Sequence, residues 1–349
     1  MNKLKWVILI IYASSLALFR SMKLGLLSYL PVKKDIYVSV WFGGLANNII
    51  QLAHVEYLSK RFGFTIHIPP HRLLRVGDKY KLHNIKPREF QQSSYFPSTS
   101  STVIYDLLTR PETSVGPAFS LFQRMFWQFD ILPFSPELAD YRHVLRHELF
   151  PVIPQHADEL IKDDTLVIHI RSGDVFWEDL TRLHKGYIQP PLSFYLEIIN
   201  KFNFKDIVIV TQDDFKNPCI NELKRLMPDI RIQTSNILDD ISTIISARNL
   251  VVAHSSFSLC LGLASDKLKR MFIPQFDITN KFYYTRAPFW PNIYKYSFVS
   301  KTSISHFRNL NCDVRLVTIR DYVPIGAWQN TPQQRDLMLA HSRDLINFR

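Results

Sequence analysis

The chain has 349 residues, 46% of them hydrophobic and 25 of them phenylalanine, which allows two domains with well-filled cores and excludes an intrinsically disordered protein. Its net charge of +11 suits an anionic partner such as nucleic acid, a membrane surface or a phosphorylated small molecule. The basic residues form no dense block, which weakens the nucleic-acid interpretation. Cys219, Cys260 and Cys312 are far apart, which argues against a structural zinc site and a disulfide framework, although one disulfide with a spare thiol stays open.

The N-terminal segment predicts an interaction with a membrane. Residues 6–19 carry no charge and are almost wholly apolar, with lysines before them and Arg20 and Lys23 after them. The run is short for a bilayer span, which needs about 20 apolar residues. Two interpretations remain: a signal anchor extended by snorkelling basic side chains, or a cleaved signal peptide. No Ala-x-Ala site follows the run directly, so residues 1–30 are expected to be a signal anchor and stem.

Residues 31–160 predict a first α/β domain. The pattern gives a strand, a glycine turn, a helix with apolar residues at helical spacing, and a second strand, at residues 36–42, 43–48, 49–62 and 64–68. Residues 70–135 are rich in Pro, Ser and aromatic residues and predict a long, loop-rich insertion that shapes an acceptor site. A further helix is expected over residues 135–149.

Residues 161–325 predict a second α/β domain, followed by a C-terminal tail at 326–349. Apolar runs predict strands at residues 166–170, 207–211, 230–233, 250–253 and 270–273. Helical patterns lie between them, at residues 192–200, 218–227, 236–247 and 259–264. This regular alternation calls for a parallel, doubly wound sheet.

The first of these strands carries the main candidate site. It reads Leu-Val-Ile-His-Ile-Arg-Ser-Gly-Asp over residues 166–174, so a histidine and an arginine interrupt a buried apolar run. The carboxyl edge of such a sheet is where α/β proteins bind ligands. Arg171 offers a planar fork of donors that suits a phosphate. The alternative is that Arg171 and Asp174 pair with each other or with loop carbonyls, since buried charges are usually paired.

Four segments then point to a family. Residues 43–48 read Gly-Gly-Leu-Ala-Asn-Asn, and residues 169–174 read His-Ile-Arg-Ser-Gly-Asp. Residues 208–214 end in Thr-Gln-Asp-Asp, and residues 239–258 begin with Asp-Asp and end in Ser-Ser-Phe-Ser. In this order they resemble the G-x-x-G-N-Q, H-x-R-R-x-D, T-D-D or S-D-D and S-S/T-F-S segments of GDP-fucose-dependent fucosyltransferases, including the α1,2-fucosyltransferases. The resemblance spans about residues 36–275.

This resemblance implies a fold and an activity. The fold is GT-B, two Rossmann-like domains with the substrate cleft between them, preceded here by the membrane helix. The activity is inverting transfer of L-fucose from GDP-fucose to a glycan hydroxyl, without a metal or other cofactor, by a single-pass type II protein of the Golgi membrane. A secreted or other endomembrane location is the alternative. Ala46, Asn48 and Ser172 depart from the motifs, and Ser172 removes one cation expected at the donor.

The resemblance also implies roles for residues. Arg171 contacts the β-phosphate of the donor and stabilises the charge that develops on the departing diphosphate. His169 contacts the nucleotide or orients Arg171, with a satisfied core histidine as the alternative. Asp174 is expected to be a structural partner of its loop within the donor site. Asp240 resembles an acidic residue that binds the base, because a carboxylate accepts both N–H donors of guanine.

The turns at two expected helix starts complete the candidate site. Backbone N–H groups and hydroxyls at Ser255, Ser256, Phe257 and Ser258 are expected to hold phosphate oxygens, with ordinary N-capping as the alternative. In the first domain the glycine turn is expected to face the donor, and its Asn47 to position the acceptor hydroxyl or the leaving group. Asn47 stabilising a tight turn is the alternative. The glycines of this turn assigned to the donor site are Gly43 and Gly44.

A rival hypothesis is a degenerate transferase that holds glycans or partner proteins. Ser172 and the absence of an obvious general base support it. A transferase that uses another sugar nucleotide is a further alternative. In each case the expected partners are a sugar nucleotide, a glycan or glycoconjugate and the membrane, and not nucleic acid.

Overall fold

The computed structural model describes residues 35–38, 40–41, 44–63, 65–74, 78–84, 118–119, 142–149, 161–179, 188–276, 312–322 and 328–348. The chain divides into two compact units, Met1–Ile153 and Pro154–Arg349. The expected signal anchor and most of the loop-rich insertion lie outside the described residues. Within the described ranges, no helix combines the length and apolar character that a membrane crossing needs.

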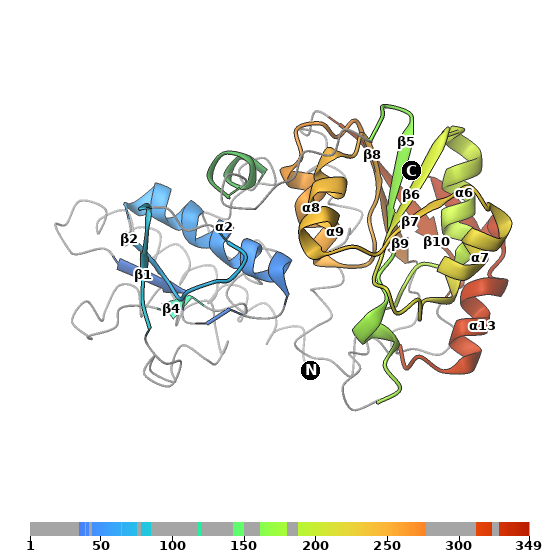
Figure 1. Ribbon diagram of the computed structural model, residues 1–349, viewed down its shortest axis with the longest axis horizontal. Helices are drawn as coiled ribbons and strands as arrows, with labels where there is room; N and C mark the ends of the chain where they lie inside the picture. The colour runs from blue at the N-terminus through green and yellow to red at the C-terminus, as the bar shows by residue number, and fades with distance from the viewer. Residues whose placement is uncertain are drawn as a thin grey trace, which may run out of the picture. The chain divides into compact units, whose positions relative to one another are not determined.

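The first unit contains a four-stranded parallel sheet in the order β3-β2-β1-β4 (Figure 1). Its strands are β1 Asp35–Val38, β2 Thr65–Ile68, β3 Tyr80–Leu82 and β4 Ala118–Phe119. The strand, helix and strand expected at the start of the domain are present. The sequence pattern missed β3 and β4 because strands of three and two residues are too short to show a period.

Helix α2, Leu45–Phe62, packs an apolar face on this sheet. It starts four residues earlier than expected, because Gly44 has an extended backbone and serves as the N-cap. It ends at Gly63, whose φ of 70° lies in the left-handed region that glycine adopts at low cost. Ile49, Leu52 and Ala53 are buried, as their helical spacing predicts.

A buried carboxylate joins α2 to the end of the unit. Glu56 is completely buried, and its Oε1 lies 2.8 Å from Nζ of Lys79. Lys79 and Lys60 both pair with Glu148 of η4, a π-helix at Leu145–Leu149. The described part of the helix expected over residues 135–149 is therefore helical. The ion pair between Lys60 and Glu148 joins it to α2.

The second unit contains a seven-stranded sheet in the order β11-β10-β9-β8-β5-β6-β7. Six strands are parallel, and β11 runs antiparallel to β10. The strands are β5 Thr165–His169, β6 Asp206–Val210, β7 Arg231–Gln233, β8 Asn249–Val251, β9 Arg270–Phe276, β10 Asp313–Ile319 and β11 Ile346–Phe348. The chain starts at the centre with β5, builds outward to β7, and then returns to build the other half from β8, which is doubly wound topology.

Helices cover both faces of this sheet (Figure 1). α6 and α7 pack with α13 on one face, whereas α8 and α9 pack together on the other. Their bounds are α6 Leu192–Phe202, α7 Pro218–Leu226, α8 Ile237–Ser246, α9 Ser256–Ala264 and α13 Pro332–Ala340. β5 is buried at all five positions, as expected for a central parallel strand with both faces covered.

The end of the chain belongs to this unit and is not a separate tail. Within residues 326–349, α13 packs against α6 and α7, the short helix η7 at Arg343–Leu345 follows, and β11 closes the sheet. His341 fixes the connection, because Nδ1 lies 2.7 Å from Oγ of Ser193 and Nε2 donates to the carbonyl of Arg320 at 2.7 Å. The sequence pattern ended the strand set at β9 and missed these elements, since residues 277–311 interrupt the alternation.

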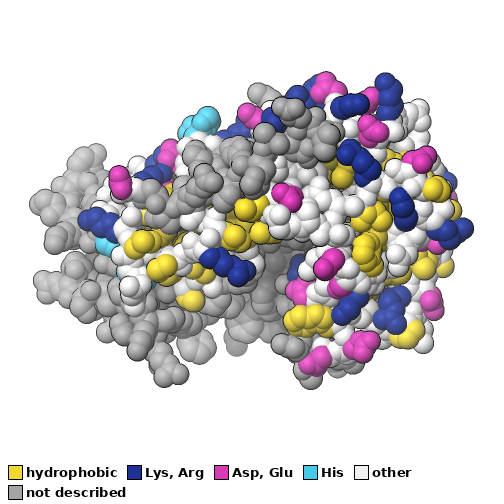
Figure 2. Space-filling model, in the orientation of Figure 1, with side chains coloured by type: hydrophobic (Ala, Val, Ile, Leu, Met, Phe, Trp, Pro, Cys, Tyr) yellow, Lys and Arg dark blue, Asp and Glu magenta, His cyan; other side chains and the backbone are white. Residues whose placement is uncertain are grey.

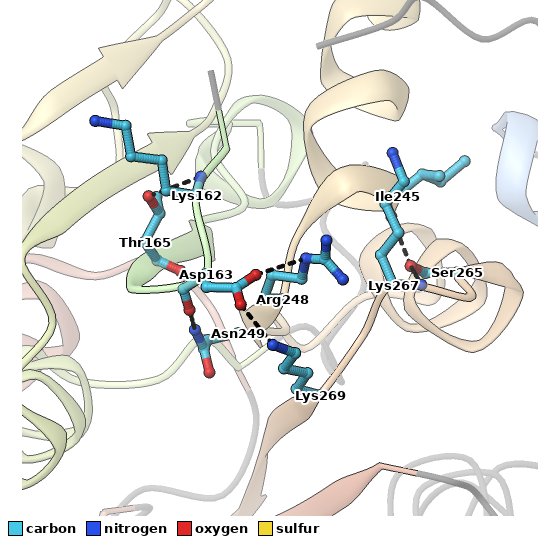
Figure 3. A network of polar contacts seen from close by, with 9 residues as sticks. All are labelled: Lys162, Asp163, Thr165, Ile245, Arg248, Asn249, Ser265, Lys267 and Lys269. Atoms are coloured by element: carbon cyan, nitrogen blue, oxygen red, sulfur yellow. Dashed lines mark hydrogen bonds and ion pairs between the residues drawn. The ribbon is translucent and has the colours of Figure 1, made fainter. Parts of the chain in front are cut away.

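Short-range ion pairs occupy the amino edge of the sheet, where β5, β8 and β9 begin (Figure 3). The carboxylate of Asp163 lies between Nε of Arg248, at 3.1 Å, and Nζ of Lys269, at 2.6 Å. Its backbone carbonyl accepts the amide of Asn249 at 2.9 Å, which joins the start of β8 to the turn before β5. These groups satisfy one another and are largely exposed, so this edge is held together by its own side chains.

The described surface in view in Figure 2 mixes basic and acidic side chains. The positive net charge of the chain is therefore not gathered into one patch on that face.

Candidate functional site

The order of strands in the second unit creates a switch point between β5 and β8. From β5 the chain builds the sheet in one direction, and from β8 it builds in the other. In open α/β sheets the crevice outside the carboxyl ends of two such strands binds ligands. His169 ends β5 and residues 170–174 follow it, while residues 254–258 lie shortly after β8, so the sheet brings two of the expected motifs together.

His169 and Ser258 form a buried hydrogen-bonded pair at this switch point. Nδ1 of His169 lies 2.8 Å from Oγ of Ser258, and both side chains are buried. Ser258 Oγ also accepts the N–H of Ala253 at 3.1 Å, so one hydroxyl joins the imidazole to the backbone that follows β8. The ring of Phe257 lies 5.5 Å from the imidazole. Burial, with a smaller contribution from Arg171, lowers the pKa of His169 to about 3, so the imidazole is neutral at physiological pH.

Arg171 lies just beyond β5 and is paired with Asp174. Its Nη2 donates to both carboxylate oxygens of Asp174, at 3.0 and 2.9 Å. The arginine side chain is 19% exposed and the aspartate 46% exposed, so the ion pair is open to solvent on the side of the carboxylate. The pairing considered as the simpler alternative therefore exists. Asp174 acts here as the partner of the arginine.

Ser172, which follows Arg171, lies in the interior of the second unit. It is completely buried, and its Oγ accepts the backbone N–H of Asn217 at 3.1 Å. The next residue, Gly173, has a φ of 66°, so the chain turns sharply there. The side chain at position 172 therefore faces the protein interior.

The serine turn caps helix α9. Ser255 is the N-cap and accepts the N–H of Phe257 at 3.2 Å, so the capping interpretation holds for this residue. Ser256 begins the helix and is partly buried. Since the hydroxyl of Ser258 is engaged with His169, the turn contributes mainly the positive end of a helix directed at the carboxyl edge.

Asp240 lies in the first turns of α8, at the same edge of the sheet. Its Oδ1 accepts Nε2 of Gln233 at 3.0 Å, and Oε1 of Gln233 accepts the hydroxyl of Thr243 at 2.9 Å. Burial raises the pKa of Asp240 to about 6, and the hydrogen bond from Gln233 opposes that rise. This oriented carboxylate is one of few groups at the edge with capacity for a further donor.

A buried hydroxyl nearby adds to this polar edge. Thr211 directly follows β6, between β5 and β7 in the sheet, and is buried. Its Oγ1 has no hydrogen-bond partner among the described residues. Buried hydroxyls in folded proteins usually have one. The sequence pattern missed Thr211 and Gln233, although both stand at strand ends, the position that singled out Arg171.

In the first unit, a hydrogen bond anchors Asn48 of the glycine turn. Asn48 is buried, and its Oδ1 lies 3.1 Å from Nε2 of His71. Nδ1 of His71 accepts the N–H groups of Leu73 and Leu74, so Nε2 carries the proton and donates to Asn48. Asn47 is partly buried in the first turn of α2.

The glycines of the turn differ in what the structure describes. Gly44 is exposed, and its carbonyl accepts the N–H groups of Asn47 and Asn48. Gly43 lies outside the described residues. The glycine turn belongs to the first unit and the Arg171 edge to the second, so each is a separate half of the expected site.

No protein-family model matches the chain, and no curated protein sequence matches it. Among solved structures, NodZ α-1,6-fucosyltransferase soaked with GDP-fucose is similar at 12% identity and a TM-score of 0.39, over 71% of this chain and 97% of that one. POFUT1 in complex with GDP-fucose is similar at 10% and 0.36, over 68% and 97%. The E. coli heptosyltransferase WaaC with ADP-2-deoxy-2-fluoro heptose is similar at 10% and 0.35, over 71% and 91%. These similarities are too distant to establish a function.

Proposed function

We propose that this protein is an inverting glycosyltransferase that transfers L-fucose from GDP-fucose to a glycan hydroxyl. The observation that carries the proposal is the position of Arg171 beside the buried His169–Ser258 pair. These residues lie at the carboxyl ends of β5 and β8, between which the order of strand addition reverses. Ligands bind at this point in doubly wound sheets. A guanidinium beside a helix N-terminus suits a diphosphate.

Arg171 acts on the leaving group. As the bond between the anomeric carbon and the β-phosphate oxygen breaks, its electron pair and negative charge move onto the diphosphate. The acceptor oxygen bonds to the opposite face of the sugar and releases its proton to solvent. A guanidinium already held in place stabilises that charge without reorganisation. The N-terminus of α9, which begins at Ser256, supplies further positive potential.

His169 contributes as a neutral group. Its low pKa means that it adds no cation beside Arg171, and its bond to Ser258 fixes the end of β5 against the start of α9. Asp240 binds the guanine base of the donor. Its ionised carboxylate, oriented by the hydrogen bond from Gln233, accepts hydrogen bonds from the two N–H groups of guanine. In the first unit, Asn47 positions the acceptor hydroxyl. Residues 1–30 anchor the enzyme in the Golgi membrane.

Titration calorimetry on the full-length protein in detergent tests the donor site. With EDTA present, GDP is expected to bind, and to bind more tightly than ADP or UDP. Absence of heat with GDP would count heavily against the proposal. A panel of sugar nucleotides and glycan acceptors then separates a transferase, which releases nucleotide, from a glycan-binding module, which releases none.

A further inference from the structure

The loop between β6 and α7 holds the backbone that carries Arg171. Asn217, which is completely buried, donates from Nδ2 to the carbonyl of Arg171 at 3.0 Å. Its backbone N–H donates to Oγ of Ser172 at 3.1 Å, and Oδ1 of Asp214 accepts the N–H of Gly173 at 3.3 Å. Three consecutive residues after β5 are therefore tied to one neighbouring loop.

Asn217 is also the N-cap of α7. Its Oδ1 accepts the N–H of Cys219 at 3.0 Å, and Pro218 occupies the first helical position. Serine, threonine or aspartate would serve a helix N-cap as well as asparagine does. None of them also carries a donor that reaches the carbonyl of Arg171 while an oxygen caps the helix. Capping alone thus leaves the amide of Asn217 unexplained, and the bond to Arg171 accounts for it.

We infer that Asn217 is a positioning residue that fixes the peptide of Arg171, so that the guanidinium is directed at the diphosphate of the donor. The inference rests on the proposed function and extends it to a residue outside every motif of the resembled family. The mechanism is indirect: Asn217 touches no reacting atom and acts through the backbone of residues 171–173. This bond is partly buried, and its loss removes one of the tethers on the backbone that carries the guanidinium.

The test is Asn217→Ser, which keeps an N-cap oxygen for α7 but is too short to reach the carbonyl of Arg171. GDP and guanosine are titrated separately by calorimetry, because guanosine lacks the phosphates that Arg171 would hold. We expect GDP to bind about tenfold more weakly, the effect of one lost hydrogen bond, and guanosine to bind within about twofold of wild type. Asn236→Ser, the same change at the N-cap of α8, should alter both affinities by the same factor.

Equal losses for GDP and guanosine, or no loss for either, would overturn the inference, because a merely structural role does not separate the two ligands. If Asn217→Ser does not fold, Ser172→Ala removes the acceptor of the backbone N–H of Asn217 and should give a smaller loss confined to GDP. A wild-type protein that binds no GDP sinks the proposed function and this inference together. Wild-type binding with unaffected variants sinks the inference alone.

Discussion

The two edges of the large sheet use polar residues in different ways. At the amino edge, Asp163 sits between Arg248 and Lys269 in exposed ion pairs, and water can replace each contact. At the carboxyl edge, His169 is buried and bonded to Ser258, and Arg171 is mostly buried and paired with Asp174. Exposed pairs contribute little to stability, whereas buried polar groups are costly unless they are bonded. Under the proposed function, the polar groups of the carboxyl edge hold the donor, whereas those of the amino edge only pair with one another.

Replacing one arginine at each edge by alanine should give the largest difference in transferase turnover. Arg171→Ala is expected to lower transferase turnover by about 100-fold or more, because it removes the donor aimed at the developing diphosphate charge. Arg248→Ala, at the amino edge, removes only an exposed ion pair and should leave turnover within about twofold of wild type. Steady-state rates with the donor in excess measure both. Equal rates for the two variants would refute the role of Arg171.

A pair of serines on one helix gives a smaller and more selective contrast. Ser258 and Ser265 are both completely buried, at the start and the end of α9. Ser258 contacts His169, and Ser265 Oγ donates to the carbonyl of Ile245 at 2.5 Å (Figure 3). Each change to alanine should cost about 1–3 kcal/mol in the free energy of unfolding.

Only Ser258→Ala should also weaken GDP binding, since it releases the end of β5. Denaturant unfolding and GDP titration of the two variants side by side measure the two effects. Loss of GDP affinity in Ser265→Ala to the same extent would show that the contrast reflects general stability and not the site.

The smallest difference is expected in how the melting temperature depends on pH when Asp240 or Asp163 is replaced. Burial raises the folded-state pKa of Asp240 to about 6, so between pH 4 and 6 the folded state binds more protons than the unfolded state. Stability contributed by this group therefore falls as pH rises through that window. Asp240→Asn should raise the melting temperature at pH 7.5, leave it nearly unchanged at pH 4, and weaken GDP binding at pH 7.5.

The pKa of Asp163 is shifted in the opposite direction, so its contribution to stability has the opposite pH dependence. The hydrogen bond from Lys269 lowers its pKa, so its contribution is present above the unfolded value and is lost as pH falls. Because the group is fully exposed, Asp163→Asn should scarcely change the melting temperature at pH 7.5. Thermal scans of both variants at the two pH values measure the difference. A melting temperature of Asp240→Asn below that of wild type at pH 7.5 would contradict the assignment of burial as the dominant cause.

Much of the architecture could be predicted from local pattern. The apolar run of β5 and the helical spacing of α2 were sufficient, because burial imposes a period on the residues that face a core. The very short β3 and β4 were missed because they show no period, and β10, β11 and α13 were missed because residues 277–311 interrupt the alternation.

The sequence by itself determined the parallel α/β class and the strand end that carries His169 and Arg171, since both follow from residue types at neighbouring positions. Only the tertiary structure decided that β8 returns to lie beside β5, which places Ser258 against His169 across 89 positions of sequence. It also decided that Ser172 faces inward and that Asn217 holds Arg171. Hydrogen bonds between residues distant in the chain depend on how strands are ordered, and local spacing carries no record of that order.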